Sequence, residues 1–230
     1  MKTRILAVAF LVLLVGSVEL PSTVQACDKL DQDQFVLAPG FVVRNYCVVS
    51  LRHRHLNFFL DYKAQNADGT VNTVIEIPAG TNDKFEVSEE TGKMCWEFKN
   101  GVPRVVKYLG YPVNYGNVPR TMGGDGDSLD MLTLGKFERR GLVLRVKLIG
   151  VMHMIDGGEV DDKLIGVVQG SDFSAYDDFS ALSAAFPGIE TILHTWFESY
   201  KGPGGDIEIT GFGDAADAQA VLDDGKAAFQ

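Results

Sequence analysis

The sequence predicts a mainly β protein with flanking helices (α+β), built as a compact β-barrel with helices packed on its outside. Short runs rich in β-branched and aromatic residues fill the middle of the chain, and apolar residues at helical spacing follow near its C-terminal end. The 230 residues, of which 46% are apolar and 23% charged, suffice for the core of one large domain.

The strand predictions depend on alternation and on β-branched content. Residues 71–77 alternate in a period-two pattern that ends at Pro78. Further β-type runs cover residues 41–49, 84–87, 94–98, 104–108 and 142–154. Ile207 and Ile209 indicate one more short strand after the glycine-rich break at residues 202–205.

Two C-terminal helices are predicted. Pro187 suits an early position of the first helix. The apolar stripe of that helix consists of Ile189, Ile192, Leu193, Trp196, Phe197 and Tyr200. Residues 215–229 predict a second helix with a weaker pattern.

The first 26 residues have the pattern of an export signal. Lys2 and Arg4 precede an apolar stretch over residues 5–16, and residues 24–26 offer a cleavage site before Cys27. At about 1.5 Å per residue the stretch spans about 18 Å, which is too short for a bilayer core of about 30 Å. We therefore expect a signal peptide over residues 1–26, an N-terminal extension over 27–56 and a main domain over 57–230, with export to the periplasm or the medium.

The cysteines leave alternatives open. Cys27 would become the new N-terminus and could carry a lipid anchor, although Gln25 is unusual for such a cleavage site. In an oxidising compartment Cys47–Cys95 is the favoured disulfide, and unpaired, partly buried thiols are the alternative. The three cysteines contain no CxxC pair, which argues against a zinc site.

The charge and hydropathy exclude some function classes. The net charge of −10 disfavours nucleic-acid binding, because phosphates are repelled. The chain has no apolar run long enough for a transmembrane helix. An anionic small substrate remains compatible with this charge, provided that metal ions reverse it locally.

Two acidic clusters carry the strongest chemical signal. Residues 123–130 read GGDGDSLD, and residues 156–163 read DGGEVDDK after a long apolar run. Such clusters are either solvated surface turns or cation sites. A calcium loop of the EF-hand type is excluded, because Leu129 and Lys136 occupy positions that need oxygen ligands. If the loops converge, their oxygen ligands favour Mg²⁺ or Mn²⁺ over zinc.

Basic and phenolic residues lie between and around these acidic clusters. They are Lys84, Arg104, Lys163, Lys201, Tyr111, Tyr115 and Tyr200. As separate residues they would be solvated groups. Gathered at one site they would bind phosphoryl oxygens through charge-assisted hydrogen bonds.

Several motifs, taken in order, resemble the family I soluble inorganic pyrophosphatases. They are VIEIPA at 74–79, KFE at 84–86, YPVNYG at 111–116, GDGDSLD at 124–130, the acidic run 156–163 and FESYK at 197–201. The resemblance covers roughly residues 57–230. One such motif alone would be weak evidence, whereas their order along the chain is specific.

The resemblance implies an OB-like five-stranded closed barrel and Mg²⁺-dependent hydrolysis of pyrophosphate to two phosphates, with Mn²⁺ as a possible substitute. It implies a mechanism with two metals and a metal-activated water. The implied metal ligands are Asp125, Asp130, Asp156 and Asp161, with Glu76 acting through water. Asp127 resembles the catalytic base. The implied phosphate ligands are Lys84, Arg104, Tyr115, Lys163, Tyr200 and Lys201.

The sequence departs from the family pattern at three places. Ser128 replaces the Pro or Glu that usually follows the second Asp, from which we expect a change in loop stiffness with activity retained. Gly157 replaces a frequent Glu, which removes one acidic group from the metal rim. Arg104 precedes Tyr111 by one residue fewer than in bacterial members.

Two other functions remain as alternatives. The first is an exported module that binds divalent cations or polyphosphate without turnover, for which a base at Asp127 would be unnecessary. The second is a phosphatase acting on another diphosphate, such as a nucleotide, although no aromatic stripe for base stacking is evident. The family resemblance also implies a homo-oligomer, either a dimer or a hexamer.

Overall fold

A computed structural model describes residues 36–53 and 55–229 of the chain. The predicted signal peptide, its cleavage site and Cys27 lie outside these residues. The strands are β1 (Phe41–Arg44), β2 (Cys47–Ser50), β3 (Val71–Ile77), β4 (Phe85–Val87), β5 (Met94–Trp96), β6 (Phe98–Lys99), β7 (Val102–Pro103), β8 (Asn114–Asn117), β9 (Asp130–Leu134), β10 (Val143–Asp156), β11 (Glu159–Val160), β12 (Lys163–Val168) and β13 (Ile207–Gly213). The helices are α2 (Phe179–Ala185), α3 (Ile189–Ser199) and α4 (Ala215–Ala228).

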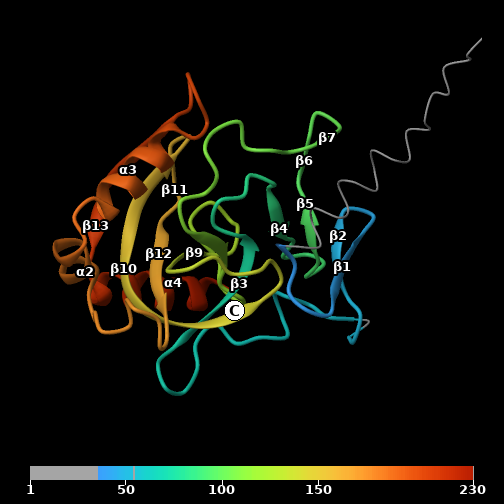
Figure 1. The fold of residues 1–230 in the computed structure, drawn as a ribbon, viewed down its shortest axis with the longest axis horizontal. Coiled ribbons are helices and arrows are strands. Elements are labelled where there is room, and N and C mark those ends of the chain that lie inside the picture. Colours follow the sequence, from blue (N-terminus) through green and yellow to red (C-terminus); the bar gives the residue numbers. More distant parts are fainter. Residues whose placement is uncertain (1–35, 54, 230) are drawn as a thin grey trace, which may run out of the picture.

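Five strands form a ring at the centre of the molecule (Figure 1), in the order β10-β12-β9-β8-β3, which closes where β3 pairs with β10. The pair β12–β9 is parallel and the other pairs of the ring are antiparallel. β10 makes the closure possible, because its first residues pair with β3 and its later residues pair with β12 and β13. The predicted mainly β architecture with flanking helices is confirmed.

The structure corrects several strand predictions. The run 41–49 is a hairpin rather than one strand, because Asn45 and Tyr46 both adopt left-handed φ angles, 49° and 64°. Residues 104–108 form no strand. Their pairing with residues 82–84 is limited to the isolated bridge Asp83↔Val105, and the Asn82 side chain takes the carbonyls of Val106 and Tyr108, so the ladder does not continue.

Three strands of the ring were not predicted from the sequence pattern: β8, β9 and β12. β8 reads NYGN and has no apolar alternation, and β12 reads KLIGVV and is buried on both faces along most of its length. Burial on both faces removes the period-two signal on which the other predictions depended.

The helical predictions are confirmed for α3 and α4, and α2 was missed. α3 begins at Ile189, after Gly188 as its N-cap, so Pro187 lies just outside the helix. α2 has only 7 residues, too few for a periodic pattern. Its one sequence signal is Asp178, whose side chain accepts the N–H of Ser180 and so caps the helix.

Apolar clusters surround the ring on three sides. One lies between the ring and α2 and α3, and includes Phe179, Leu193 and Trp196. The second packs Ala218 and Leu222 of α4 against the ring. The third joins the ring to a separate sheet of order β1-β2-β5-β4. No helix among the described residues combines the length and apolar character that crossing a bilayer requires.

The N-terminal extension contributes β1 and β2 to that separate sheet. Cys47 on β2 and Cys95 on β5 are register partners and form a disulfide. The pairing favoured for an oxidising compartment is therefore the one in the structure. In Figure 1 the hairpin β1–β2 lies on the opposite side of the molecule from α2 and α3.

Asp178 accepts hydrogen bonds at the N-termini of α2 and α4, so we expect its removal to lower the stability of the fold. One carboxylate oxygen accepts the Ser180 N–H at 2.8 Å, and the other accepts the Ala215 N–H at 3.2 Å. We expect Asp178→Ala to lower the free energy of unfolding by about 1–2 kcal/mol, measured by urea denaturation at pH 7. The hydrogen bonds from Ser180 lower the pKa of Asp178, so the stabilisation is complete above pH about 4 and is lost below it.

Asp177→Ala is the matched control, because the Asp177 side chain is 93% exposed and its one ion pair within residues 36–53 and 55–229 is with Lys147 at 2.9 Å. It should change the free energy of unfolding by less than about 0.5 kcal/mol. Equal losses in the two variants would contradict the capping role.

Candidate active site

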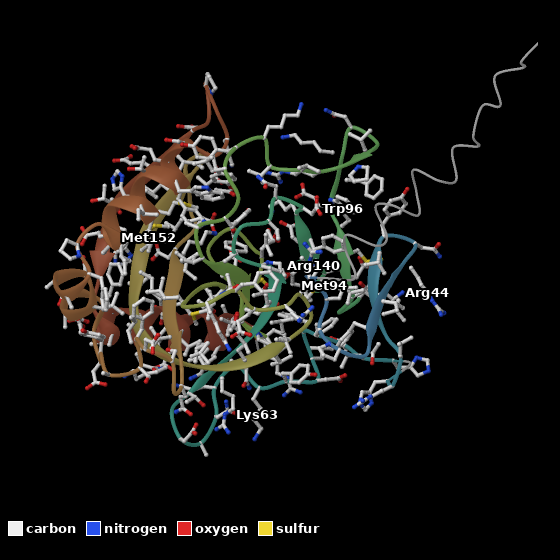
Figure 2. All side chains as sticks on the ribbon, viewed as in Figure 1. Arg44, Lys63, Met94, Trp96, Arg140 and Met152 are labelled. Atoms are coloured by element: carbon white, nitrogen blue, oxygen red, sulfur yellow. A yellow bond between two sulfur atoms is a disulfide. The ribbon has the colours of Figure 1, made fainter. Side chains whose placement is uncertain are left out.

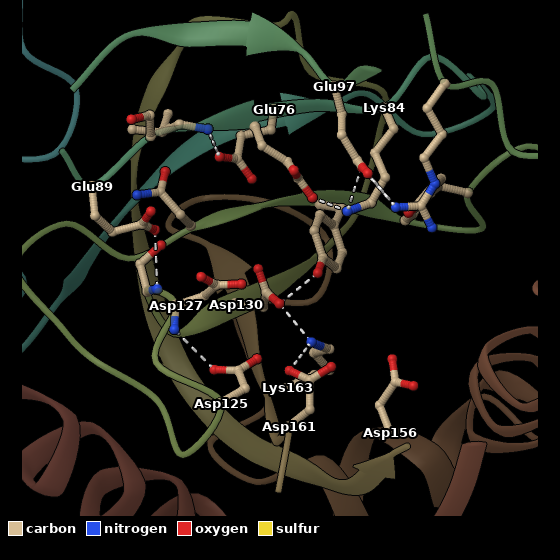
Figure 3. A pocket seen from close by; sticks show the side chains of 18 of the residues that line it. Glu76, Lys84, Glu89, Glu97, Asp125, Asp127, Asp130, Asp156, Asp161 and Lys163 are labelled. Carbon is tan, nitrogen blue, oxygen red and sulfur yellow. Dashed lines mark hydrogen bonds and ion pairs between the residues drawn. The ribbon is translucent and has the colours of Figure 1, made fainter. Parts of the chain in front are cut away.

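The predicted site residues line one open cavity of about 380 Å³ at one end of the ring (Figure 3). Its lining includes Glu76, Lys84, Arg104, Tyr111, Tyr115, Asp125, Asp127, Asp130, Asp156, Asp161, Lys163, Tyr200 and Lys201. The polar residues therefore gather at one place although they come from β3, β8, β9, β10, β12, the end of α3 and several loops. The alternative of separate solvated groups is wrong.

Two glycines let the acidic loops approach each other. A β-carbon at Gly124 would lie 3.1 Å from the Val160 carbonyl oxygen, so the first acidic loop packs closely against β11 in the second. Gly225 of α4 lets the helix lie close to the same loop, because a β-carbon there would lie 2.5 Å from Leu129 Cδ1. The absence of these side chains leaves room for the first acidic loop to pack closely against β11 and α4.

Lys163 lies between two of the carboxylates. Its Nζ donates to Asp130 Oδ2 at 2.5 Å and also to Asp161 Oδ1. Lys163 is the parallel register partner of Asp130, and it is only 3% exposed. Burial opposes its charge, but Asp130 and Asp161 raise the pKa of Lys163 above its usual range, so the ammonium form prevails.

Burial also raises the pKa of the Asp161 carboxyl to about 6; Lys163 opposes this shift, and the nearby Asp130 adds to it. Tyr115 completes this group, because its hydroxyl donates to Asp130 Oδ2 at 2.5 Å. Asp130 is thus held by a cation on one strand and a phenol on another.

Asp125 and Asp127 lie beside this group (Figure 3). The backbone N–H of Asp127 donates to Asp125 Oδ1 at 3.1 Å, which fixes the turn between them. Partial burial raises the pKa of the Asp127 carboxyl, and Asp125 and Glu89 add to this by repulsion. A raised pKa is a property that a carboxylate acting as a proton acceptor needs.

Asp156 and Lys201 form a second ion pair at the cavity. Lys201 Nζ donates to both oxygens of Asp156, at 2.6 and 2.5 Å. In Figure 3 Asp156 lies apart from Asp125, Asp130 and Asp161. Tyr200 precedes Lys201 and stacks on Trp196 with ring centroids 5.0 Å apart, and its burial raises the pKa of Tyr200 to about 12.

The Glu76 side chain reaches the cavity from a β-bulge in β3. The register of β3 against β8 shifts between Ile75 and Ile77, which leaves Glu76 as the extra residue. One carboxylate oxygen accepts the Val87 N–H at 2.6 Å, and the Glu76 carbonyl accepts Arg140 Nε at 2.8 Å. Arg140, labelled near the centre of the molecule in Figure 2, is fully buried. Burial raises the pKa of Glu76 well above its usual value, and Asp130 adds to this shift.

Lys84 and Arg104 are held together by Glu97. Arg104 Nη1 contacts both carboxylate oxygens of Glu97, at 2.8 and 2.7 Å, and Lys84 Nζ lies 3.4 Å from the same side chain. Lys84 also pairs with Glu86. Arg104 therefore lines the cavity even though it precedes Tyr111 by one residue fewer than in bacterial members.

Sequence reasoning assigned no role to several polar cavity residues, among them Glu86, Glu89, Glu97 and Asn117. Glu86 could have been found, because it lies two residues from Lys84 on one strand face. Glu89 accepts the N–H of Ser128 at 3.1 Å, and proline at position 128 could not donate this bond. Asn117 is the register partner of Asp130 and is 1% exposed. Glu97 and Asn117 gave no sequence signal, since only the tertiary fold brings them to the site.

The departure at Gly157 has a conformational explanation. Gly157 and Gly158 have φ angles of 60° and 90° and form the tight turn between β10 and β11. A side chain at position 157 would be strained in this turn.

The chemistry of the donor set fits a hard divalent cation. The cavity is lined by five aspartates but by no histidine, and its one cysteine, Cys95, is held in the disulfide. Among the residues that the structure describes, no three His, Cys, Asp or Glu side chains are placed closely enough to hold an ion as they lie. Lys163 and Lys201 contact three of the aspartates instead, so a cation would compete with these ammonium groups.

The comparisons with known proteins agree with this geometry. The inorganic pyrophosphatase family matches residues 73–230. Soluble inorganic pyrophosphatase 2 of Chlamydomonas reinhardtii is 37% identical over 165 residues, which are 71% of this chain and 82% of that protein.

Solved structures agree as well. The inorganic pyrophosphatase of Helicobacter pylori superposes with a TM-score of 0.65 at 30% identity, over 74% of this chain and 99% of that one. The type I enzyme of Toxoplasma gondii has a TM-score of 0.73 at 24% identity, over 82% and 96% of the two chains, and supports the fold alone. The chain therefore belongs to the family I soluble inorganic pyrophosphatases and is an inorganic diphosphatase, an enzyme that hydrolyses inorganic pyrophosphate.

Proposed function

We propose that this chain hydrolyses pyrophosphate with Mg²⁺, or with Mn²⁺ as a substitute, at the cavity described above. The observation that carries this proposal is the gathering of Asp125, Asp127, Asp130 and Asp161 in one cavity that Lys84 and Arg104 also line. Carboxylates suit hard cations, and the lysine and arginine suit phosphoryl oxygens.

The residues that would hold the metals are Asp125, Asp130 and Asp161, with Asp156 joining them and Glu76 acting through water. When bound there, two Mg²⁺ ions neutralise phosphate charge and lower the pKa of water. Lys163 would yield its contacts with Asp130 and Asp161 to the metals and turn its ammonium group toward a phosphate. Lys201 would do the same from Asp156.

The remaining steps belong to side chains of this chain. Asp127 takes the proton of the attacking water, for which its raised pKa is suited. Lys84, Arg104, Lys163 and Lys201 fix the phosphates and balance their charge, and the hydroxyls of Tyr115 and Tyr200 orient them. Because phosphoryl transfer depends mainly on positioning and electrostatics, these contacts supply most of what the protein contributes.

An Asp127→Asn variant tests the proposal. The amide keeps the shape of the side chain but cannot accept the proton, so we expect kcat to fall by about 10²- to 10⁴-fold. Phosphate release from pyrophosphate is measured at saturating Mg²⁺, and Mg²⁺ binding is measured by calorimetry and should persist. Asp172→Asn, at an exposed position outside the cavity, is the matched control and should leave kcat unchanged.

The outcomes separate this function from its alternatives. Mg²⁺ binding without phosphate release in the wild type would favour a module that binds without turnover. Faster release from a nucleoside diphosphate than from pyrophosphate would favour the other phosphatase.

The contact between Glu89 and Ser128 gives a second prediction. Glu89 fixes the backbone next to Asp127, and groups that orient metal ligands often affect metal affinity. We expect Glu89→Ala to raise the Mg²⁺ concentration for half-maximal activity about tenfold. Glu89→Gln, whose carbonyl still accepts the Ser128 N–H, should retain most of the affinity. Glu90→Gln, on the exposed neighbour, is the charge control. Equal effects of the two Glu89 variants would assign the effect to charge rather than to the hydrogen bond.

We also propose export by the N-terminal signal, with Cys27 as the mature N-terminus. The disulfide Cys47–Cys95 supports this, because such bonds persist in oxidising compartments. Cell fractionation and N-terminal sequencing should find the processed chain outside the cytoplasm. Recovery with membranes that Cys27→Ser abolishes would favour the lipid anchor, and unprocessed protein in the cytosol would contradict export.

The ring of five strands supports the assignment of an OB-like closed barrel. We further expect a homo-oligomer, a dimer or a hexamer, which light scattering after gel filtration would measure.

A further inference from the structure

The hairpin β1–β2 joins the wall of the cavity through a very short backbone pairing. β2 and β5 share the single register pair Cys47↔Cys95, and the disulfide connects these same residues. One further backbone bond follows, from the Trp96 N–H to the Tyr46 carbonyl at 2.7 Å. The covalent link therefore strengthens a contact that has little ladder of its own.

Trp96 connects the hairpin to Arg104 through hydrogen bonds. Trp96, next to Cys95, is 7% exposed and stacks on Phe85 with centroids 5.2 Å apart. Its indole N–H donates to the Arg104 carbonyl at 2.8 Å. Figure 2 shows Trp96 between the hairpin and the centre of the molecule. The backbone N–H of Trp96 is thus held by the hairpin, and its side chain holds Arg104.

Arg104 is joined to Lys84 by backbone bonds as well as through Glu97. The Lys84 N–H donates to the Arg104 carbonyl at 3.1 Å, and the Arg104 N–H donates to the Glu97 carbonyl at 2.7 Å. The Glu97 N–H donates back to the Lys84 carbonyl at 2.8 Å. A shift of Trp96 would therefore displace both cations of this cavity wall.

We propose that the disulfide-linked hairpin positions Lys84 and Arg104 to bind the substrate. Trp96 is the positioning residue that connects the hairpin to these two cations. This inference rests on the proposed function of these two cations. It gives the extension a role in binding pyrophosphate, and it makes that binding sensitive to reduction of Cys47–Cys95. The carboxylates proposed to bind metal lie on β3, on β9, at the end of β10 and in the two acidic loops, so the chemical step depends less on the hairpin.

The first test is reduction of the purified chain. Dithiothreitol transfers two electrons and two protons to the disulfide, giving two thiols, and is itself oxidised to its cyclic disulfide. We expect KM for pyrophosphate at saturating Mg²⁺ to rise about three- to tenfold, the range that one weakened hydrogen bond supports, and kcat to stay within about twofold. The variant C47S/C95S should show the raised KM from the start and no response to dithiothreitol.

The second test leaves the disulfide in place. Trp96→Phe keeps an aromatic ring against Phe85 but removes the N–H that binds the Arg104 carbonyl. We expect the same rise in KM in the oxidised protein, with the disulfide verified by thiol titration. Reduction of Trp96→Phe should add little further, because both changes act through one contact.

A purely structural brace would lower the melting temperature in both experiments and leave KM unchanged, and that result would overturn the inference. If the reduced protein loses its fold by circular dichroism, the oxidised Trp96→Phe variant decides. An oxidised wild type that releases no phosphate would instead refute the proposed function.

Discussion

The ammonium group of Lys163, held between Asp130 and Asp161, is the interaction on which the architecture of the site depends. Carboxylates gathered in a partly buried cavity repel one another, and folding them together requires positive charge. Lys163 supplies this charge from β12, and Lys201 does the same for Asp156. Divalent cations that compete for these carboxylates would release the ammonium groups for an anion. One set of charges can thus stabilise the folded chain and bind a strongly anionic substrate.

The ring determines which charges meet. The parallel pair β12–β9 places Lys163 directly opposite Asp130, and the antiparallel pair β8–β9 places Tyr115 close enough to donate to the same carboxylate. The extra residue in β3 adds Glu76 from a third strand. Each of these positions is fixed by a backbone register, so the side chains need little freedom of their own. A rigid frame of this kind suits a reaction that depends on positioning.

Some of this arrangement could be predicted from the sequence, and the reasons for success and failure are physical. The acidic loops, Lys84 and Lys201 belong to local motifs, and local motifs can be recognised without the fold. The helix stripe of α3 and the alternation of β3 follow from one buried face. By contrast, Glu97 and Asn117 reach the site only through tertiary pairing, and β12 has no periodic pattern because it is buried on both faces. The turn at Asn45 and Tyr46 was hidden because the apolar residues on both sides resemble one continuous strand.

The hairpin shows how a chain can extend the wall of a site without a long interface. A strand edge that shares a single register pair with its neighbour contributes little cooperative hydrogen bonding. Apolar contacts of Phe41 and Val48 with the third cluster add burial, but these contacts are not directional. The disulfide supplies the missing directional constraint at the residue that precedes Trp96. Since Lys84 pairs with Glu86 and Arg104 pairs with Glu97, a wall fixed in this way holds both ion pairs at the cavity that the two cations line.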